Sequence, residues 1–285
     1  MEISVDDNEM EGAMADMDYK KMYKYIKEFK MLISKARIGI FASSAAFFLF
    51  LSIIPVIMVV SSLIPESVLD ARRVIGVSQA VIPEKIYFFL LGIVESYHGN
   101  EMTLLSFSAI IAVWSASKGM LAMIRGLNHI YEVKENGNYI FLRFKAIMYT
   151  IFLLLAIVLA VGILLFGNSL LDFFMIEVGM ISLFWKFIGA IRHVFVACMI
   201  SVLFCTMYFL LPNNHLEWGA HYPGAVFTSV FWTLFSLAFS VYIDYFDGFS
   251  MYGSLTTIVI VMIWLYACMY IFFCGALVNK WIDKS

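Results

Sequence analysis

Six long runs of apolar residues divide this chain of 285 residues and limit what it can fold into. They cover residues 39–64, 102–124, 144–167, 184–211, 220–243 and 251–279. A hydrocarbon core about 30 Å thick needs roughly 20 apolar residues per helix, and every run is long enough to cross it. Because 62% of the residues are hydrophobic and only 14% are charged, a single water-soluble globule is excluded, and the many aromatic residues exclude disorder.

The runs predict an all-α, polytopic integral membrane protein with six transmembrane helices. A transmembrane β-barrel would show strict alternation of polar and apolar residues over segments of about ten residues. Residues 151–165 contain no polar side chain at all. Since lipid offers no hydrogen-bond partners, a helix, which satisfies its own backbone, is the structure that we expect.

The distribution of lysine and arginine predicts the orientation of the helices. With six spans and both termini in the cytoplasm, thirteen basic residues lie on the cytoplasmic side and four on the outer side. We see no cleaved signal peptide, so the first apolar run is expected to act as the targeting signal. The chain is thus predicted to be a multi-pass protein of the plasma membrane.

Three regions are expected along the chain. Residues 1–18 are acidic and are predicted to be a disordered tail. Residues 19–37 combine apolar residues at helical spacing with lysines, which predicts a basic amphipathic helix at the anionic inner leaflet; a solvated lead-in that only enforces orientation is the alternative. Residues 38–282 form the membrane domain, with a long outer loop at 65–101.

Ionisable residues in the second run are the first functional candidates, because a charge inside a membrane is costly. Four polar residues recur at intervals of seven, four and three, which places them on one helix face: Lys118, Arg125, His129 and Glu132. If the outer end of the helix is near Met102, Lys118 lies near the inner boundary. It then either reaches water with its long side chain or lines a cavity.

Arg192 and two aspartates form a second candidate group. Arg192 lies about 10 Å below the outer end if its helix starts near Trp185 and rises about 1.5 Å per residue. The fifth run goes the opposite way and brings Asp244 and Asp247 to the same side. We predict an ion pair between Arg192 and one of these aspartates, which either holds the bundle together or serves transport. A pair between Lys118 and Asp244 is rejected because it would bridge most of the membrane.

Small residues spaced by four predict close contacts between helices. In the second run they are Ser108, Ala112 and Ala116, with Ser115 and Gly119 on the neighbouring face, and in the fifth run they are Gly224 and Thr228. The sequence leaves open whether the chain assembles into a homo-oligomer.

Signatures of enzymes and of cofactor sites are absent from the sequence. There is no Walker loop, no G-x-S-x-G, no H-E-x-x-H and no Rossmann glycine pattern after a strand. The histidines are scattered along the chain, and the four cysteines, which we assign to packing, lie inside apolar runs: Cys198, Cys205, Cys268 and Cys274. We therefore assign no catalytic residue, no metal and no cofactor, and we expect neither enzymatic activity nor a nucleic-acid partner.

Three strings resemble a known family. They are "VWSASKGMLAMIRGLNHIYEV" at 113–133, "LPN" at 211–213 followed by a tryptophan and "PGA" within 218–225, and "YGSLTTIVIVMIWLYACMYIFFCGALVN" at 252–279. They look like those of the YihY/virulence factor BrkB family of bacterial inner-membrane proteins, and the resemblance covers about residues 30 to 282. It implies a location in the bacterial plasma membrane. Members of this family were once labelled ribonuclease BN, a tRNA-processing enzyme, but the residues here supply no nuclease site.

The leading hypothesis is a membrane protein that moves or gates a small solute, an ion or a lipid through a path between helices. A non-transporting scaffold or envelope-integrity factor is the second hypothesis, and a ribonuclease acting on tRNA is the third. The candidates that line the path are Lys118, Arg125, Asn128, Arg192, Asp244, Tyr252 and Gly253.

The membrane assignment predicts how the chain fractionates. After cells are broken without detergent, we expect the chain to sediment with the membranes at high speed and to dissolve only when detergent is added, because water cannot solvate its apolar segments. Recovery of the chain in the supernatant would contradict this assignment.

Overall fold

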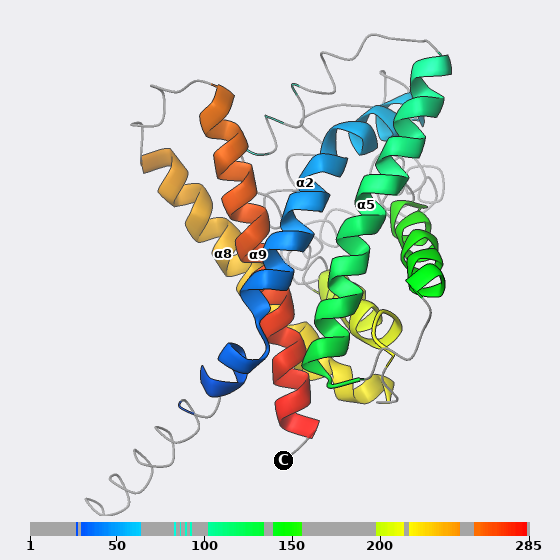
Figure 1. Cartoon of the computed structure of the whole chain (residues 1–285). Helices are drawn as coiled ribbons and strands as arrows, with labels where there is room; N and C mark the ends of the chain where they lie inside the picture. The colour runs from blue at the N-terminus through cyan, green and yellow to red at the C-terminus, as the bar shows by residue number, and fades with distance from the viewer. Residues whose placement is uncertain are drawn as a thin grey trace, which may run out of the picture. The chain divides into compact units, whose positions relative to one another are not determined.

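The computed structural model describes residues 27, 30–63, 83, 86, 89, 92, 102–133, 139–155, 198–213, 217–245 and 254–283. The chain divides into two units, Met1–Ile38 and Gly39–Ser285. Its four long helices are α2 (Ile38–Leu63), α5 (Met102–Ile130), α8 (Tyr222–Tyr245) and α9 (Ser254–Asp283), and a short 3-10 helix, η2 (Trp218–His221), precedes α8 (Figure 1). Every element in the described ranges is helical, which confirms the all-α class.

In the first unit, residues 30–35 are helical. This short helix ends where the Ala36 N–H donates to the Leu32 carbonyl oxygen at 2.9 Å and Arg37 takes a left-handed conformation with φ 48°. Most of the amphipathic helix predicted at 19–37, and the whole acidic tail at 1–18, lie outside the described residues. Their interaction with the inner leaflet stays a prediction.

Among the described residues, four helices are long and apolar enough to cross a membrane, and they correspond to the first, second, fifth and sixth apolar runs. Residues 139–155 and 198–210 are also helical and fall in the third and fourth runs, whose remaining parts lie outside the described residues. Six spans and a cytoplasmic location of both termini therefore stay predictions, as does the outer loop at 65–101.

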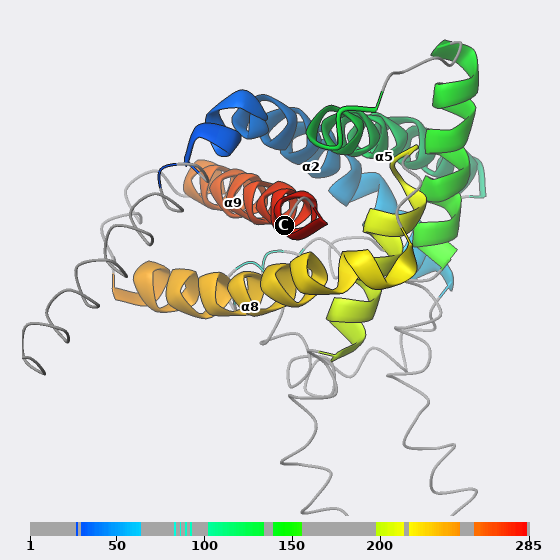
Figure 2. The ribbon, with the colours of Figure 1, turned by 90° about the horizontal axis from the view of Figure 1, so that it is seen from below.

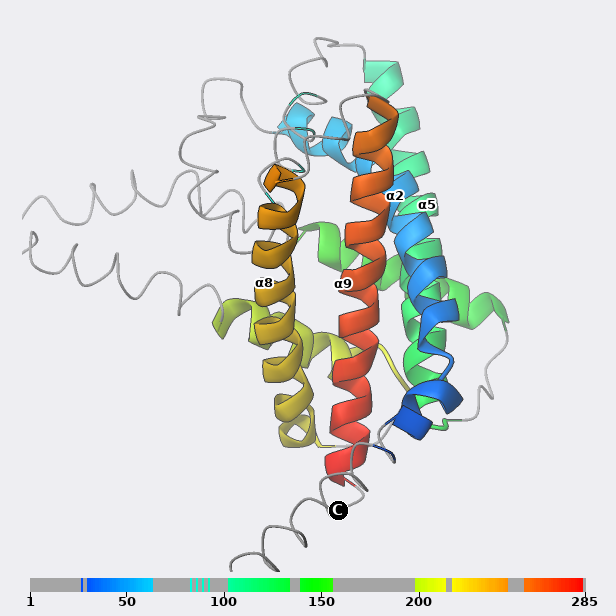
Figure 3. The ribbon, with the colours of Figure 1, turned by 90° about the vertical axis from the view of Figure 1, so that its left-hand side faces the viewer.

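Helix α9 is the central element of the second unit. It contacts both α8 and α5, and Figure 2 shows it between α8 on one side and α2 and α5 on the other. Helices α8 and α9 lie side by side and run antiparallel (Figure 3). The C-terminal ends of α5 and α9 thus meet the N-terminal end of α8. We call this region the basal end and define it by residues 39–41, 128–133, 218–224 and 279–283.

Two glycines allow the backbones of α8 and α9 to touch near the basal end. A Cβ atom on Gly224 would overlap the carbonyl oxygen of Gly275, and a Cβ on Gly275 would overlap the hydroxyl oxygen of Thr228. Only glycine lacks this atom, and small residues are the usual means by which membrane helices approach closely. The contact that the sequence predicts for Gly224 and Thr228 is confirmed.

Tyr208, in the helical segment 198–210, ties this crossing to the core. Its hydroxyl donates to the Phe272 carbonyl oxygen at 2.6 Å and lies 2.6 Å from the Thr228 hydroxyl. Because the phenol has one proton, the Thr228 hydroxyl donates in the second bond. The ring of Tyr208 stacks on that of Phe272, with centroids 4.9 Å apart. Three helices are therefore joined around one buried hydroxyl group.

Helix α8 places its small and polar side chains inward and its large apolar ones outward. Ala225, Thr228 and Ser236 are buried. An exposed apolar stripe runs along the opposite face at helical spacing: Val226, Val230, Leu234, Leu237, Val241 and Tyr245. An exposed stripe of this length is unfavourable in water and is the expected surface of a helix in lipid.

Small residues also face inward on α5. Ala112, Ser115 and Ala116 are buried, and a Cβ added to Gly119 would lie 3.2 Å from the side chain of Leu49 in α2. The close packing that the sequence predicts for this run is confirmed at these positions.

The glycine crossing predicts a large effect of one added methyl group. Gly275→Ala should lower stability by about 1–3 kcal/mol, because the new Cβ meets backbone and hydroxyl atoms that cannot move independently of the helices. Gly219→Ala is the matched control, since a Cβ there meets nothing within 4 Å. Thermal unfolding of the detergent-purified chain measures both variants, and equal melting temperatures would contradict the crossing.

Candidate functional site

The residues predicted to line a path fall into three groups. Arg192, Asp247, Tyr252 and Gly253 lie outside the described residues, and so does the side chain of Asp244. The ion pair predicted for Arg192 therefore stays a prediction. Lys118 lies in α5, and Arg125 and Asn128 lie nearer to the end of the same helix.

Lys118 is half-buried and lies against aromatic rings. Its Nζ atom is 3.7 Å from the ring centroid of Trp114 and 5.2 Å from that of Phe48. Such cation–π contacts contribute about 0.5–2 kcal/mol each, depending on how far water is excluded. Lys118 is thus held by rings of α5 and α2, two helical turns away from Arg125.

Arg125 and Asn128 come together in an open pocket at the basal end. The pocket is lined by Phe41 of α2, by Arg125, Asn128 and His129 of α5, and by Val133 just after that helix. Arg125 and His129 are exposed, whereas Asn128 is only 1% exposed and so forms the floor. The His129 ring packs on Phe41, with centroids 5.5 Å apart.

Asn128 has one satisfied and one unsatisfied side-chain group. Its Oδ1 atom accepts a hydrogen bond from the Asn213 N–H at 2.9 Å. Its Nδ2 atom is buried and has no partner within the part of the chain that the structure describes. A buried donor costs about 1–3 kcal/mol unless an acceptor meets it.

The end of α5 is a Schellman cap. The Val133 N–H donates to the Asn128 carbonyl oxygen at 2.9 Å, and the Glu132 N–H donates to that of His129 at 3.2 Å. Glu132 itself is left-handed, with φ 55°. The expectation that Glu132 continues the polar stripe of the helix is therefore wrong, because the chain leaves the helix before it. Its carboxylate pairs with Lys280 of α9 at 2.7 Å.

Lys145 and Asn213 form a second polar link, which joins Asn128 at the floor of the pocket and which we did not predict from the sequence. Lys145 donates to the Leu211 carbonyl oxygen at 3.1 Å and to Asn213 Oδ1 at 2.6 Å. A cation near the last carbonyl groups of a helix is favourable, and here it caps the segment 198–210. The same Asn213 donates its N–H to Asn128. The "LPN" string was the available signal, but nothing in it pointed to Lys145.

Asn279 and His221 are further buried polar residues at the basal end. Asn279 Oδ1 accepts from the Gly224 N–H at 2.6 Å, and Asn279 Nδ2 donates to the Tyr131 hydroxyl at 3.5 Å. Burial raises the pKa of Tyr131 well above its usual value, so the phenol stays protonated. The fully buried ring of His221 packs edge-on against Tyr131, and neither ring nitrogen has a partner among the described atoms.

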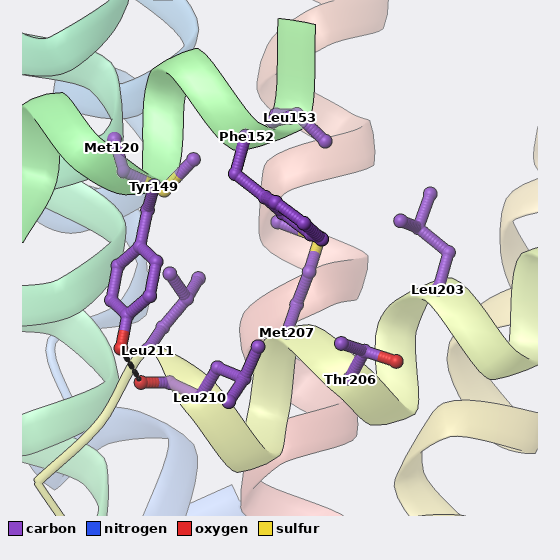
Figure 4. A pocket seen from close by; sticks show the side chains of 9 residues that line it. All are labelled: Met120, Tyr149, Phe152, Leu153, Leu203, Thr206, Met207, Leu210 and Leu211. Carbon is purple, nitrogen blue, oxygen red and sulfur yellow. Dashed lines mark hydrogen bonds between the residues drawn. The ribbon is translucent and has the colours of Figure 1, made fainter. Parts of the chain in front are cut away.

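A small apolar pocket lies between α5 and the helical segments 139–155 and 198–210 (Figure 4). Met120, Phe152 and Met207 are among its lining residues. Tyr149 points its hydroxyl to the Leu210 carbonyl oxygen at 2.8 Å, which adds a second cap to that segment. The lining of this pocket offers few polar atoms that could bind a polar molecule.

Across the described ranges, no three His, Cys, Asp or Glu side chains lie close enough together to hold a metal ion. All four cysteines, which lie in those ranges, are free thiols, and three of them are buried.

Comparison with known proteins gives a consistent assignment. The family model described as virulence factor BrkB matches residues 32–285. A putative ribonuclease-like protein, YfkH of Bacillus subtilis, is 31% identical over 245 residues, which are 85% of this chain and 89% of the relative. A UPF0761 membrane protein of Vibrio parahaemolyticus is 28% identical over 90% of this chain and 82% of its own length. A UPF0761 membrane protein of Coxiella burnetii is 24% identical over 84% of this chain and 86% of its own length. No solved structure matches the chain.

The buried and exposed polar contacts of the basal end should differ in energy. Asn279→Leu should lower stability by about 1–3 kcal/mol, because it leaves the Gly224 N–H without its acceptor. Glu132→Gln should cost less than about 1 kcal/mol, because the carboxylate is 71% exposed and water screens its pair with Lys280. Urea or thermal unfolding in detergent measures both, and a larger loss for Glu132→Gln would refute this ranking.

Proposed function

The chain belongs to the virulence factor BrkB family, and from this premise we propose that it moves a small solute, an ion or a lipid through a path between the helices of its membrane domain. It is an integral membrane protein, as the names of its relatives and its four apolar spans indicate. The observation that carries the proposal is the pocket in which Arg125 and Asn128 come together.

The state of these two residues favours a path over a purely structural role. In a scaffold, buried polar groups are expected to satisfy one another, as Asn279 and Gly224 do. Asn128 Nδ2 has no such partner among the described residues. For Arg125, the one contact recorded in the same ranges is with the Tyr139 ring, 5.8 Å from its centroid. The Arg125 guanidinium is therefore open to a molecule that enters the pocket, and Asn128, a lining residue, keeps an unpaired donor.

We place one mouth of the path at the basal end. With both termini in the cytoplasm, this mouth opens to the cytoplasm, and Lys118 lies two helical turns further along α5. Arg192, Asp244, Tyr252 and Gly253 are proposed to line the remaining part. The activity is taken to be non-enzymatic, and the ribonuclease-like name is said of the Bacillus subtilis relative, not of this chain.

Transport in proteoliposomes tests the proposal. We expect the reconstituted chain to move at least one member of a panel of labelled ions, solutes and fluorescent lipids faster than empty liposomes do. Arg125→Gln should lower that flux by about tenfold, because a hydrogen bond to a charged group contributes about 1.5–3 kcal/mol.

Arg143→Gln removes the same charged group at a residue that does not line the pocket and should leave the flux unchanged. No flux across a broad panel, or an equal loss in both variants, would favour the scaffold hypothesis. Degradation of tRNA by the purified chain, abolished by Arg125→Gln, would instead favour the ribonuclease hypothesis.

A further inference from the structure

We propose that the pocket at the end of α5 binds an anionic phosphate group, carried by a soluble phosphate ester or by a lipid headgroup. This inference rests on the proposed function insofar as the bound group is taken as cargo. Binding itself, however, can be measured without transport.

Arg125 supplies the positive charge. Its guanidinium carbon lies 5.8 Å from the centroid of the Tyr139 ring, a contact that uses none of its N–H donors in a hydrogen bond. The five N–H donors lie in the plane of the guanidinium and point from its edge, where they fit two phosphate oxygens at once. The Arg125 side chain is exposed, so these donors are open to the pocket.

Asn128 determines the sign of the charge that a ligand in the pocket carries. Its Oδ1 atom is occupied by the Asn213 N–H, and this bond fixes the orientation of the amide. The remaining group, Nδ2, can only donate, so a ligand that reaches the floor of the pocket must accept. A cation would meet a guanidinium and an N–H donor and would find no acceptor on either.

The negative groups at the end of α5 itself are already occupied. The C-terminal end of a helix carries a partial negative charge. Here, however, the carbonyl oxygens of Asn128 and His129 accept the two bonds of the Schellman cap. The Glu132 carboxylate is paired with Lys280 at 2.7 Å. Lys145, which donates to Asn213 at 2.6 Å, adds a positive charge behind the floor. The balance of charge around the pocket therefore favours an anion.

The walls of the pocket suit an organic phosphate. Phe41 and Val133 are apolar, and the His129 ring packs on Phe41. Such walls can cover the carbon atoms of an ester while Arg125 and Asn128 hold its oxygens. Glycerol 3-phosphate and the headgroup of phosphatidylglycerol share this chemistry, and the experiment separates them.

Thermal unfolding of the full chain in maltoside detergent is the first arm of the test. We expect glycerol 3-phosphate to raise the melting temperature in a saturable way, while sodium chloride at equal ionic strength does not. Arg125→Gln should weaken the apparent affinity by about tenfold or more, since bidentate pairing with a guanidinium is lost. Arg143→Gln, at a residue that does not line the pocket, is the charge-matched control and should respond as the wild type does.

Asn128→Asp isolates the buried donor. The aspartate keeps an acceptor for the Asn213 N–H and replaces only the Nδ2 group by an oxygen, which repels phosphate. Glycerol 3-phosphate should not raise the melting temperature of Asn128→Asp above that of the same variant without ligand. A response equal to that of the wild type in Asn128→Asp or in Arg125→Gln would overturn the proposal.

Nanodiscs form the second arm. If the lipid headgroup is the source, phosphatidylglycerol should stabilise the wild type more than phosphatidylcholine does, Arg125→Gln should reduce the difference, and glycerol 3-phosphate should compete. If a soluble ester is the source, glycerol 3-phosphate should raise the melting temperature in detergent, and phosphatidylglycerol should stabilise the wild type no more than phosphatidylcholine does. No response in either arm overturns the anion site, even when proteoliposomes show flux. Binding of glycerol 3-phosphate or phosphatidylglycerol without flux in proteoliposomes would contradict the proposed function but would support the anion site.

Discussion

The approach of Gly224 to Gly275 is the contact on which the basal end depends. Because no side chain separates the two backbones, the Gly224 N–H reaches Asn279, and Thr228 reaches the Tyr208 hydroxyl. Helix α9 then presents Phe273 to Gly126, where a Cβ atom would overlap the ring. The position of the pocket residues on α5 therefore follows from a contact on the opposite side of α9.

Much of this architecture could be predicted from the sequence, because lipid leaves a chain few alternatives. Apolar runs must be helical in a membrane, and α2, α8 and α9 agree with their runs to within a few residues. The second apolar run ends at residue 124 because polar residues follow it. The helix continues to Ile130, since helix formation does not require apolar side chains and the Schellman cap supplies the stop.

The candidate site was predictable only in part. Arg125 and Asn128 were singled out as polar residues within or beside a span, and the structure places both in one pocket. The link from Lys145 through Asn213 to Asn128 joins residues far apart in the chain and depends on tertiary packing that no local pattern encodes. Gly275 was missed for the same reason, because its partner lies on another helix.

The Tyr208 hydroxyl also bears on how the domain can move. It binds a backbone oxygen of α9 and a side chain of α8 from a third helix, so sliding either helix past the other would expose paired polar groups to hydrocarbon. Tyr208 therefore holds these three elements against sliding. The boundary between α9 and the end of α5 has polar links of its own near the basal end, from Asn279 to Tyr131 and from Lys280 to Glu132, so sliding there would separate paired groups as well.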